Sequence, residues 1–309
     1  MTTADLGKVS IEYEITGEGP PLLLVMGLAS QLIHWHPDLV AQIADRGFRV
    51  ITFDNRDIGL STKFTGEPAG VARILASLVS HRMARAEYLL SDMADDAAHL
   101  LDHLDINAAH VVGVSMGGMI AQSIAIGHPG KVLSLTSIMS NTGDRKHGKP
   151  AMSLLRKMPR LLGGQPNADG TISKKLLDNG VETTRLISGP HFDETEERAM
   201  IQRAFERDFT PAGTMRQMMA ISASPDRTSG LRTVTAPTLV IHGLVDPLVQ
   251  PSGGMATARA VPGSRLLMLP DMGHDLPRNR WTEIVDAIVT NSQRVSPSRL
   301  SATASTNVN

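Results

Sequence analysis

A serine stands in the middle of residues 113–117, which read GVSMG and so have the form G-x-S-x-G. The preceding residues 110–114 are mostly β-branched and apolar, which is typical of a buried strand, whereas residues 116–126 have helical character. Residues 128–130, His-Pro-Gly, should end that helix because the residue before a proline is disfavoured in the α region. We therefore expect Ser115 on a sharp strand-to-helix turn, where small flanking residues let the backbone approach closely.

A serine hydroxyl becomes a nucleophile only with a base to take its proton and a third group to orient that base. Asp246 follows an apolar, strand-like run at 237–243, and His274 follows a similar run at 264–269. Both positions come at the carboxyl end of a predicted strand, where open α/β sheets place their sites. The chain order Ser, Asp, His is also the one expected for a nucleophile on such a turn. The spacing therefore predicts a catalytic triad of Ser115, Asp246 and His274.

Other acids and histidines could compete for these roles. Asp271 is a rival acid, but it lies too close to His274 along the same loop to orient the ring easily. His242 lies inside a strand run, so we expect it to pack. His99 and His103 are four residues apart on a predicted helix and could form a metal pair, but the helix is rich in Asp and no third ligand is near in sequence. A solvated helix face is favoured there, and we expect no metal and no cofactor.

An acyl-transfer site also needs two backbone N–H donors for the oxyanion. One should come from Met116, the residue after the nucleophile, and the other from the loop after an earlier strand. Residues 21–26 read as that strand, and Leu28 in the following loop is the second donor that we assign. The alternative is an ordinary loop leucine at this position.

The elements that must position these residues alternate along the chain. Strands are predicted at 8–15, 21–26, 48–53, 110–114 and 132–138, and helices at 37–47, after a possible N-cap at Ser91, and at 116–126. Such alternation of strands and helices predicts an α/β fold with a mostly parallel sheet wrapped by helices on both faces.

The alternation stops between residues 144 and 230, a stretch rich in charge, Met and Gly with helical pieces at 194–208 and 211–221. We interpret residues 144–230 as a helical cap inserted into a core that comprises 1–143 and 231–292. Residues 293–309 are rich in Ser, Thr and Asn, so we expect a disordered tail there.

Composition excludes several classes of function. The 309 residues have a formal net charge of −1, so no overall basic field favours nucleic acid or an anionic membrane. The absence of cysteine excludes disulfides, thiolate metal sites and a cysteine nucleophile. No secretory signal and no run of about 18 apolar residues is visible, so a cytoplasmic protein without a membrane span is expected.

Element order, the turn at Ser115 and the Ser–Asp–His order together resemble the α/β-hydrolase superfamily over about residues 8–290. Residues 54–61, DNRDIGLS, resemble the D-x-R-G-x-G-x-S stretch of capped members, with Asp57 in place of a usual glycine. The sequence also has Met26-Gly27 where many capped relatives have His-Gly. In combination these motifs look most like capped serine esterases and lipases of the aclacinomycin methylesterase and mycobacterial LipG types.

The resemblance implies a serine hydrolase that cleaves carboxylic esters of small molecules through an acyl-enzyme on Ser115. Haloalkane dehalogenases and epoxide hydrolases of this fold have Asp at the same turn, so the serine argues for acyl transfer. Related serine members act as cofactor-free perhydrolases or C–C hydrolases, and others are non-catalytic ligand receptors; these alternatives stay open. The oligomeric state also stays open.

The substrate pocket has weaker signals. Six of the 16 methionines fall in the predicted cap, among them Met215, Met218 and Met219, and flexible Met side chains suit an apolar acyl group. The alternative is that they only pack cap helices together. Trp35 is a candidate for the pocket mouth, and equally for a packing anchor.

Overall fold

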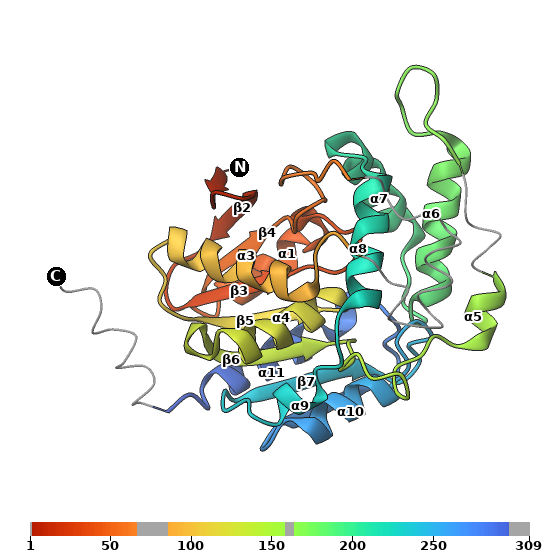
Figure 1. The fold of residues 1–309 in the computed structure, drawn as a ribbon. Helices are drawn as coiled ribbons and strands as arrows, with labels where there is room; N and C mark the ends of the chain where they lie inside the picture. The colour runs from red at the N-terminus through yellow and green to blue at the C-terminus, as the bar shows by residue number, and fades with distance from the viewer. Residues whose placement is uncertain (1, 67–85, 158–163, 297–309) are drawn as a thin grey trace.

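A parallel sheet forms the centre of the computed structural model, which describes residues 2–66, 86–157 and 164–296. In these ranges eight strands have the order β1-β2-β4-β3-β5-β6-β7-β8. The strands are β1 (Thr2–Asp5), β2 (Ser10–Thr16), β3 (Pro21–Val25), β4 (Arg49–Phe53), β5 (Ala109–Val114), β6 (Val132–Ile138), β7 (Thr238–Gly243) and β8 (Arg265–Leu269). Strands β4, β3, β5, β6, β7 and β8 run parallel, and β1 and β2 add an antiparallel edge (Figure 1).

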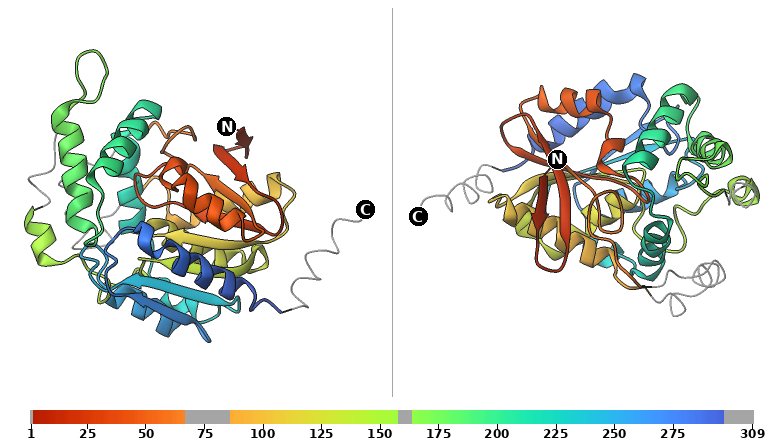
Figure 2. Two further views of the ribbon diagram at one scale, coloured as in Figure 1. Left: turned by 180° about the vertical axis from the view of Figure 1, so that it is seen from behind. Right: turned by 90° about the horizontal axis from the view of Figure 1, so that it is seen from above.

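Helices cover both faces of the sheet (Figure 2). One face holds α3 (Leu90–His103), α4 (Met116–Gly127), α9 (Thr228–Leu231) and α10 (Ser252–Ala260), and the other holds α1 (Pro37–Ala44) and α11 (Trp281–Ser292). Alternate side chains of β3 show why: Leu23 packs in the core under α3 and α4, whereas Leu22 and Leu24 pack in the core under α1 and α11. A strand buried on both faces must be apolar throughout, and this confirms the predicted doubly wound α/β fold.

Some predicted boundaries were wrong. Ser91 does not cap α3: the helix begins at Leu90, and the Asp92 carboxylate accepts the Leu89 N–H at 2.6 Å, while Ser91 lies exposed in the first turn. Helix α1 ends at Ala44 before Gly47, which adopts a positive φ of 86°. The short edge strand β1 was not predicted, because four residues carry too little alternation to be recognised.

Between β6 and β7 the chain forms α5 (Met152–Lys157), α6 (Lys174–Ile187), α7 (Glu194–Arg207) and α8 (Pro211–Ala223). These helices, called the cap helices below, stand together at one end of the sheet (right in Figure 1). Helix α9 follows them and packs on α4 of the core. Since β6 and its parallel neighbours end on this side, the cap helices emerge from the carboxyl edge of the sheet.

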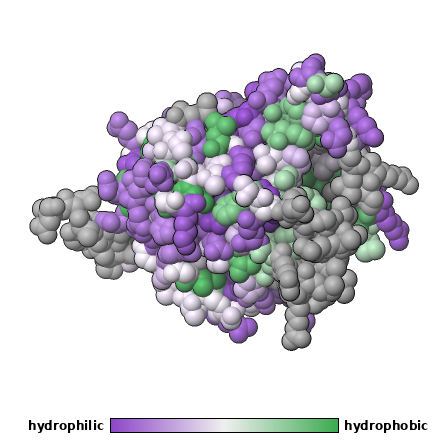
Figure 3. Space-filling view, turned by 45° about the horizontal axis from the view of Figure 1, so that its top comes forward, coloured by the Kyte–Doolittle hydropathy of each residue, from purple (hydrophilic) through white to green (hydrophobic). Residues whose placement is uncertain are grey.

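The surface and the chain end complete the fold. The face drawn in Figure 3 is mostly hydrophilic, with separate hydrophobic areas. In the described ranges, no helix has both the length and the apolarity that crossing a membrane requires. After α11, Val295 is buried against Ala108 and Leu133, so the first residues of the predicted tail pack on the core. The remainder of that tail, 297–309, lies outside the described residues.

The junction of β5 and α4 leaves no room for a side chain at Gly113 or at Gly117, the glycines two positions before and after Ser115. A Cβ atom added to Gly113 would lie 2.1 Å from the Gly117 carbonyl oxygen, and one added to Gly117 would lie 2.0 Å from the Val25 carbonyl oxygen. Ser115 itself adopts φ 53° and ψ −120°, a backbone conformation that residues with a Cβ rarely adopt. Its N–H donates to the Ile138 carbonyl oxygen at 2.9 Å, which helps to hold this strained backbone in place.

The strain at Ser115 predicts an unusual order of stability for two substitutions. Ser115→Gly should unfold with a free energy about 1 kcal/mol higher than Ser115→Ala, because relief of strain of roughly 1–3 kcal/mol exceeds the entropic cost of glycine. Both variants lack the hydroxyl, so urea unfolding compares the backbone alone. At the exposed helical Ala199, by contrast, Ala→Gly should lose about 0.5–1 kcal/mol. A Ser115→Gly variant that is less stable than Ser115→Ala by about 0.5–1 kcal/mol, as expected at Ala199, would show that this backbone is unstrained.

Candidate functional site

The carboxyl ends of β5, β7 and β8 bring Ser115, Asp246 and His274 into one hydrogen-bonded chain. The Nε2 atom of His274 lies 2.8 Å from Ser115 Oγ, and its Nδ1 atom lies 2.8 Å from Asp246 Oδ2. The Asp246 side chain is fully buried and the His274 side chain is only 7% exposed, whereas Ser115 is partly accessible. The three residues predicted from spacing are therefore neighbours in space.

Hydrogen bonds around Asp246 determine which ring nitrogen of His274 carries the proton in the neutral ring. Burial alone would raise the pKa of Asp246, but hydrogen bonds from His242 and His274, the attraction of His274 and the Val249 N–H outweigh it and hold the pKa below its usual value. An ionised carboxylate only accepts, so His274 Nδ1 must donate to it. In the neutral ring Nε2 is then an acceptor, and it faces the Ser115 hydroxyl as a base would.

The Asp246 loop is itself held by its neighbours. Backbone N–H groups of Leu248 and Val249 both donate to Asp246 Oδ1 at 2.9 Å, which leaves Oδ2 for His274. His242 is completely buried, with Nε2 2.7 Å from the Val249 carbonyl oxygen and 3.5 Å from Asp246 Oδ2. His242 is thus buried, as expected for a packing residue, and its ring lies next to the Asp246 carboxylate.

Asp271, the rival acid, turns away from His274. Its carboxylate accepts hydrogen bonds from Arg280 Nε and pairs with His191 Nε2, each at 2.8 Å. The hydrogen bond from Arg280, with a smaller contribution from His191, lowers the pKa of Asp271 to about 2. Asp271 therefore links the loop after β8 to the segment between α6 and α7, and it does not contact the His274 ring.

The loop that carries His274 is tied to the end of cap helix α6. The His274 N–H donates to the Ile187 carbonyl oxygen at 2.7 Å. Asp275 accepts from the Gly273 N–H at 2.9 Å and from the Gly189 N–H at 3.2 Å, and burial raises its pKa. The sequence did not predict these contacts. Ile187 contributes only its backbone carbonyl group, and no local pattern near Asp275 indicates a partner more than 80 positions away.

The expected oxyanion donors flank the serine. A Cβ added to Gly27 would lie 3.3 Å from Ser115 Cβ, so the loop after β3 passes directly over the nucleophile. Leu28 follows in this loop, and within the described residues no group accepts its N–H. Met116 is the first residue of α4, where N–H groups have no partner inside the helix and the helix dipole is positive. The arrangement can thus present N–H donors beside Ser115.

Two of the expected pocket residues, Trp35 and Met219, are buried in packing clusters. Trp35 is 3% exposed and packs in the core under α1 and α11, a position that fits the packing anchor and not the pocket mouth. Met219 is 1% exposed and packs with Met215 and Met218 on α8, as in the alternative that these methionines pack cap helices.

The His99 and His103 side chains project from the outer face of α3. Both residues are exposed, and His103 makes an edge contact with the Tyr13 ring. In the part of the chain that the structure describes, no group of three or more His, Cys, Asp or Glu side chains gathers as a metal site would require.

Comparisons with known proteins agree with the fold. A family model described as alpha/beta hydrolase fold matches residues 20–277. The rhodomycin D methylesterase DauP of Streptomyces sp. (strain C5) is 30% identical over 278 residues, which cover 83% of this chain and 85% of that protein. DnrP of Streptomyces peucetius, also a rhodomycin D methylesterase, is 27% identical over 277 residues, with the same coverage of 83% and 85%.

Solved structures show the same architecture. The enol-lactonase from Burkholderia xenovorans LB400 superposes with a TM-score of 0.72 at 20% identity, over 95% of this chain and all of that chain. An esterase from Exiguobacterium antarcticum superposes with a TM-score of 0.70 at 17% identity, over 92% and 96% of the two chains. With its family match, its parallel sheet and its glycine-flanked serine turn, this chain belongs to the α/β-hydrolase family.

Proposed function

We propose that this protein is a serine hydrolase that cleaves carboxylic esters of small molecules through an acyl-enzyme. The observation that carries the proposal is the chain of contacts Ser115–His274–Asp246, 2.8 Å at each step, on a strained turn at the carboxyl edge of the sheet. A nucleophile, a base and a group that orients the base are the parts that acyl transfer needs.

Each group has a role that follows from its contacts. His274 Nε2 takes the proton as Ser115 Oγ attacks the ester carbonyl, and then returns it to the leaving alkoxide. Asp246 holds the ring with Nδ1–H toward its carboxylate and stabilises the imidazolium. The N–H groups of Met116 and Leu28 would stabilise the tetrahedral oxyanion. Water attacks the acyl-enzyme in a second round of the same steps, so the cycle needs no cofactor.

The relatives support the ester substrate. Two curated proteins that match over most of the chain are named as rhodomycin D methylesterases. Their identity of 27–30% leaves the particular ester of this chain open to experiment. Perhydrolase and C–C hydrolase chemistry use the same fold, and they are separated by peroxide-dependent halogenation and by turnover of diketones.

A fluorophosphonate probe should label this protein at Ser115 alone, because its partly accessible hydroxyl lies 2.8 Å from His274 Nε2 and next to the N-terminus of α4. Peptide mapping of the adduct locates the label, and p-nitrophenyl acetate hydrolysis should be lost in proportion to labelling. Ser115→Ala is the control and should take up no probe. Stoichiometric label on a different serine of the native protein would refute the assignment.

Asp246→Asn should lower kcat by about 10⁴, since an amide favours the wrong tautomer of His274. Asp271→Asn is the matched control: the same change in the next loop, at a carboxylate that does not contact His274, should leave kcat within about twofold of the native value. Steady-state kinetics and circular dichroism of both variants provide the measurement. An active Asp246→Asn beside an inactive Asp271→Asn would reverse the choice of acid.

A further inference from the structure

We propose that Gln217, on cap helix α8, is a positioning residue that holds the oxyanion loop after β3 in its active geometry. The inference rests on the proposed function, because it concerns the N–H of Leu28 that the ester hydrolysis would use. It gives the cap helices a role in the chemical step, because they would set the geometry of an oxyanion donor.

Gln217 connects two core loops with both ends of its amide. Its Oε1 accepts the N–H of Ala29 at 3.0 Å, and its Nε2 donates to the Arg56 carbonyl oxygen at 2.9 Å. The residue is 0% exposed. A buried amide with both ends bonded has one orientation, so its position fixes the backbone groups that it contacts.

Ala29 is the point at which the loop needs such support. It follows the expected donor Leu28 and has a positive φ of 60°, which is uncommon for a residue with a Cβ. A strained residue persists only when its surroundings hold it. Since Ala29 N–H belongs to the peptide unit that begins at Leu28, a shift in this unit would also turn Leu28 away from the oxyanion.

Helix α8 can act as a rigid support because it is clamped to the core beside Gln217. Arg216 donates to both carboxylate oxygens of Asp57, from Nε at 2.8 Å and Nη2 at 2.7 Å, and Tyr88 Oη donates to the same carboxylate at 2.7 Å. A Cβ on Gly213 would lie 2.0 Å from the Asp57 carbonyl oxygen, so helix and loop touch directly. Asp57, which stands where the family motif has glycine, thereby fixes the position of α8 against this core loop.

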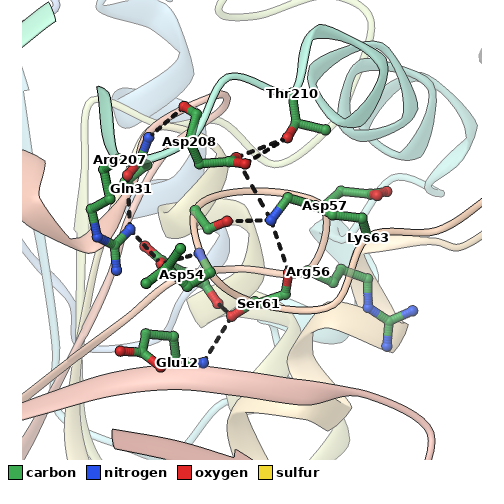
Figure 4. Close-up of polar contacts among 12 residues, drawn as sticks. Glu12, Gln31, Asp54, Arg56, Asp57, Ser61, Lys63, Arg207, Asp208 and Thr210 are labelled. Carbon is green, nitrogen blue, oxygen red and sulfur yellow. Dashed lines mark hydrogen bonds and ion pairs between the residues drawn. The ribbon is translucent and has the colours of Figure 1, made fainter. Parts of the chain in front are cut away.

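A second tie holds the far end of the oxyanion loop (Figure 4). Gln31 Nε2 donates to the Ala204 and Asp208 carbonyl oxygens at the end of α7, at 2.7 and 3.0 Å. Arg207 Nη1 donates to Gln31 Oε1 and to Asp54 Oδ2, each at 2.7 Å. With Gln31 held by α7, the contact with Gln217 is the one that lies next to Leu28.

The test compares Gln217→Met, Gln217→Glu and the control Gln202→Met. Methionine keeps the length of the side chain but offers Ala29 no comparable acceptor, whereas glutamate keeps an acceptor and, when protonated, a donor to Arg56. Gln202 is a cap glutamine on α7 whose side chain, among the described residues, bonds Glu206 alone, at the surface. Each variant is assayed for kcat and KM on p-nitrophenyl acetate, for affinity for phenylboronic acid, which forms a tetrahedral anion on the serine, and for stability to urea.

We expect Gln217→Met to lower kcat by about 10–100-fold with KM within about threefold, because a displaced oxyanion donor weakens the transition state alone. Affinity for the boronic acid should fall by a similar factor, Gln217→Glu should recover part of the loss, and Gln202→Met should match the native enzyme. A merely structural role would lower stability without this matched loss.

Native kcat and boronic acid affinity in a folded Gln217→Met would overturn the proposal while leaving the ester hydrolase function intact, as would a rise in KM at constant kcat. If Gln217→Met does not fold, Gln217→Glu decides by the same two measurements. A native protein without activity on esters would instead refute the proposed function.

Discussion

The close approach of three backbone segments at the serine turn is the constraint on which the site depends. Neither Gly113 nor Gly117 has space for a Cβ, so β5, α4 and the end of β3 can meet only if both positions are glycine. This contact forces Ser115 into a strained conformation and points its hydroxyl away from the packed core toward the carboxyl edge. The neighbouring strand β6 secures it through a single backbone hydrogen bond.

Hydrogen bonds within the loops after β7 and β8 position the other two residues of the site, Asp246 and His274. Asp246 is positioned by two N–H groups of its own loop and by a buried histidine, and it orients His274 in turn. In the proposed reaction this chain needs a carboxylate that is buried and yet ionised. Burial opposes ionisation, and the donors that surround the carboxylate outweigh it.

Three cap helices are joined to core loops near the serine. Helix α6 holds the backbone of His274, α7 holds Gln31, and α8 holds Ala29 and Asp57. These contacts are buried or partly buried and mostly involve backbone groups, which tolerate little displacement without leaving a donor or acceptor unpaired. The cap and the catalytic loops should therefore move as one unit.

Local patterns along the chain predict the order of strands and helices and place Ser115, Asp246 and His274 at strand ends. Those features are local: apolar runs of strand length, glycines at fixed offsets and the rule that parallel strands end at one edge. Closeness along the chain also favoured Asp246 over Asp271, because a residue so near His274 in the same loop cannot easily reach its ring.

The support of the site comes from contacts between segments that are far apart in the sequence. Gln217 lies 188 positions from Ala29, and Arg216 lies 159 positions from Asp57, so no local pattern links either pair. Trp35 and Met219 read equally well as pocket or packing residues, because an apolar side chain suits both, and burial alone separates them. Backbone partners such as Ile187 leave no trace in residue type, since every residue carries the same carbonyl group.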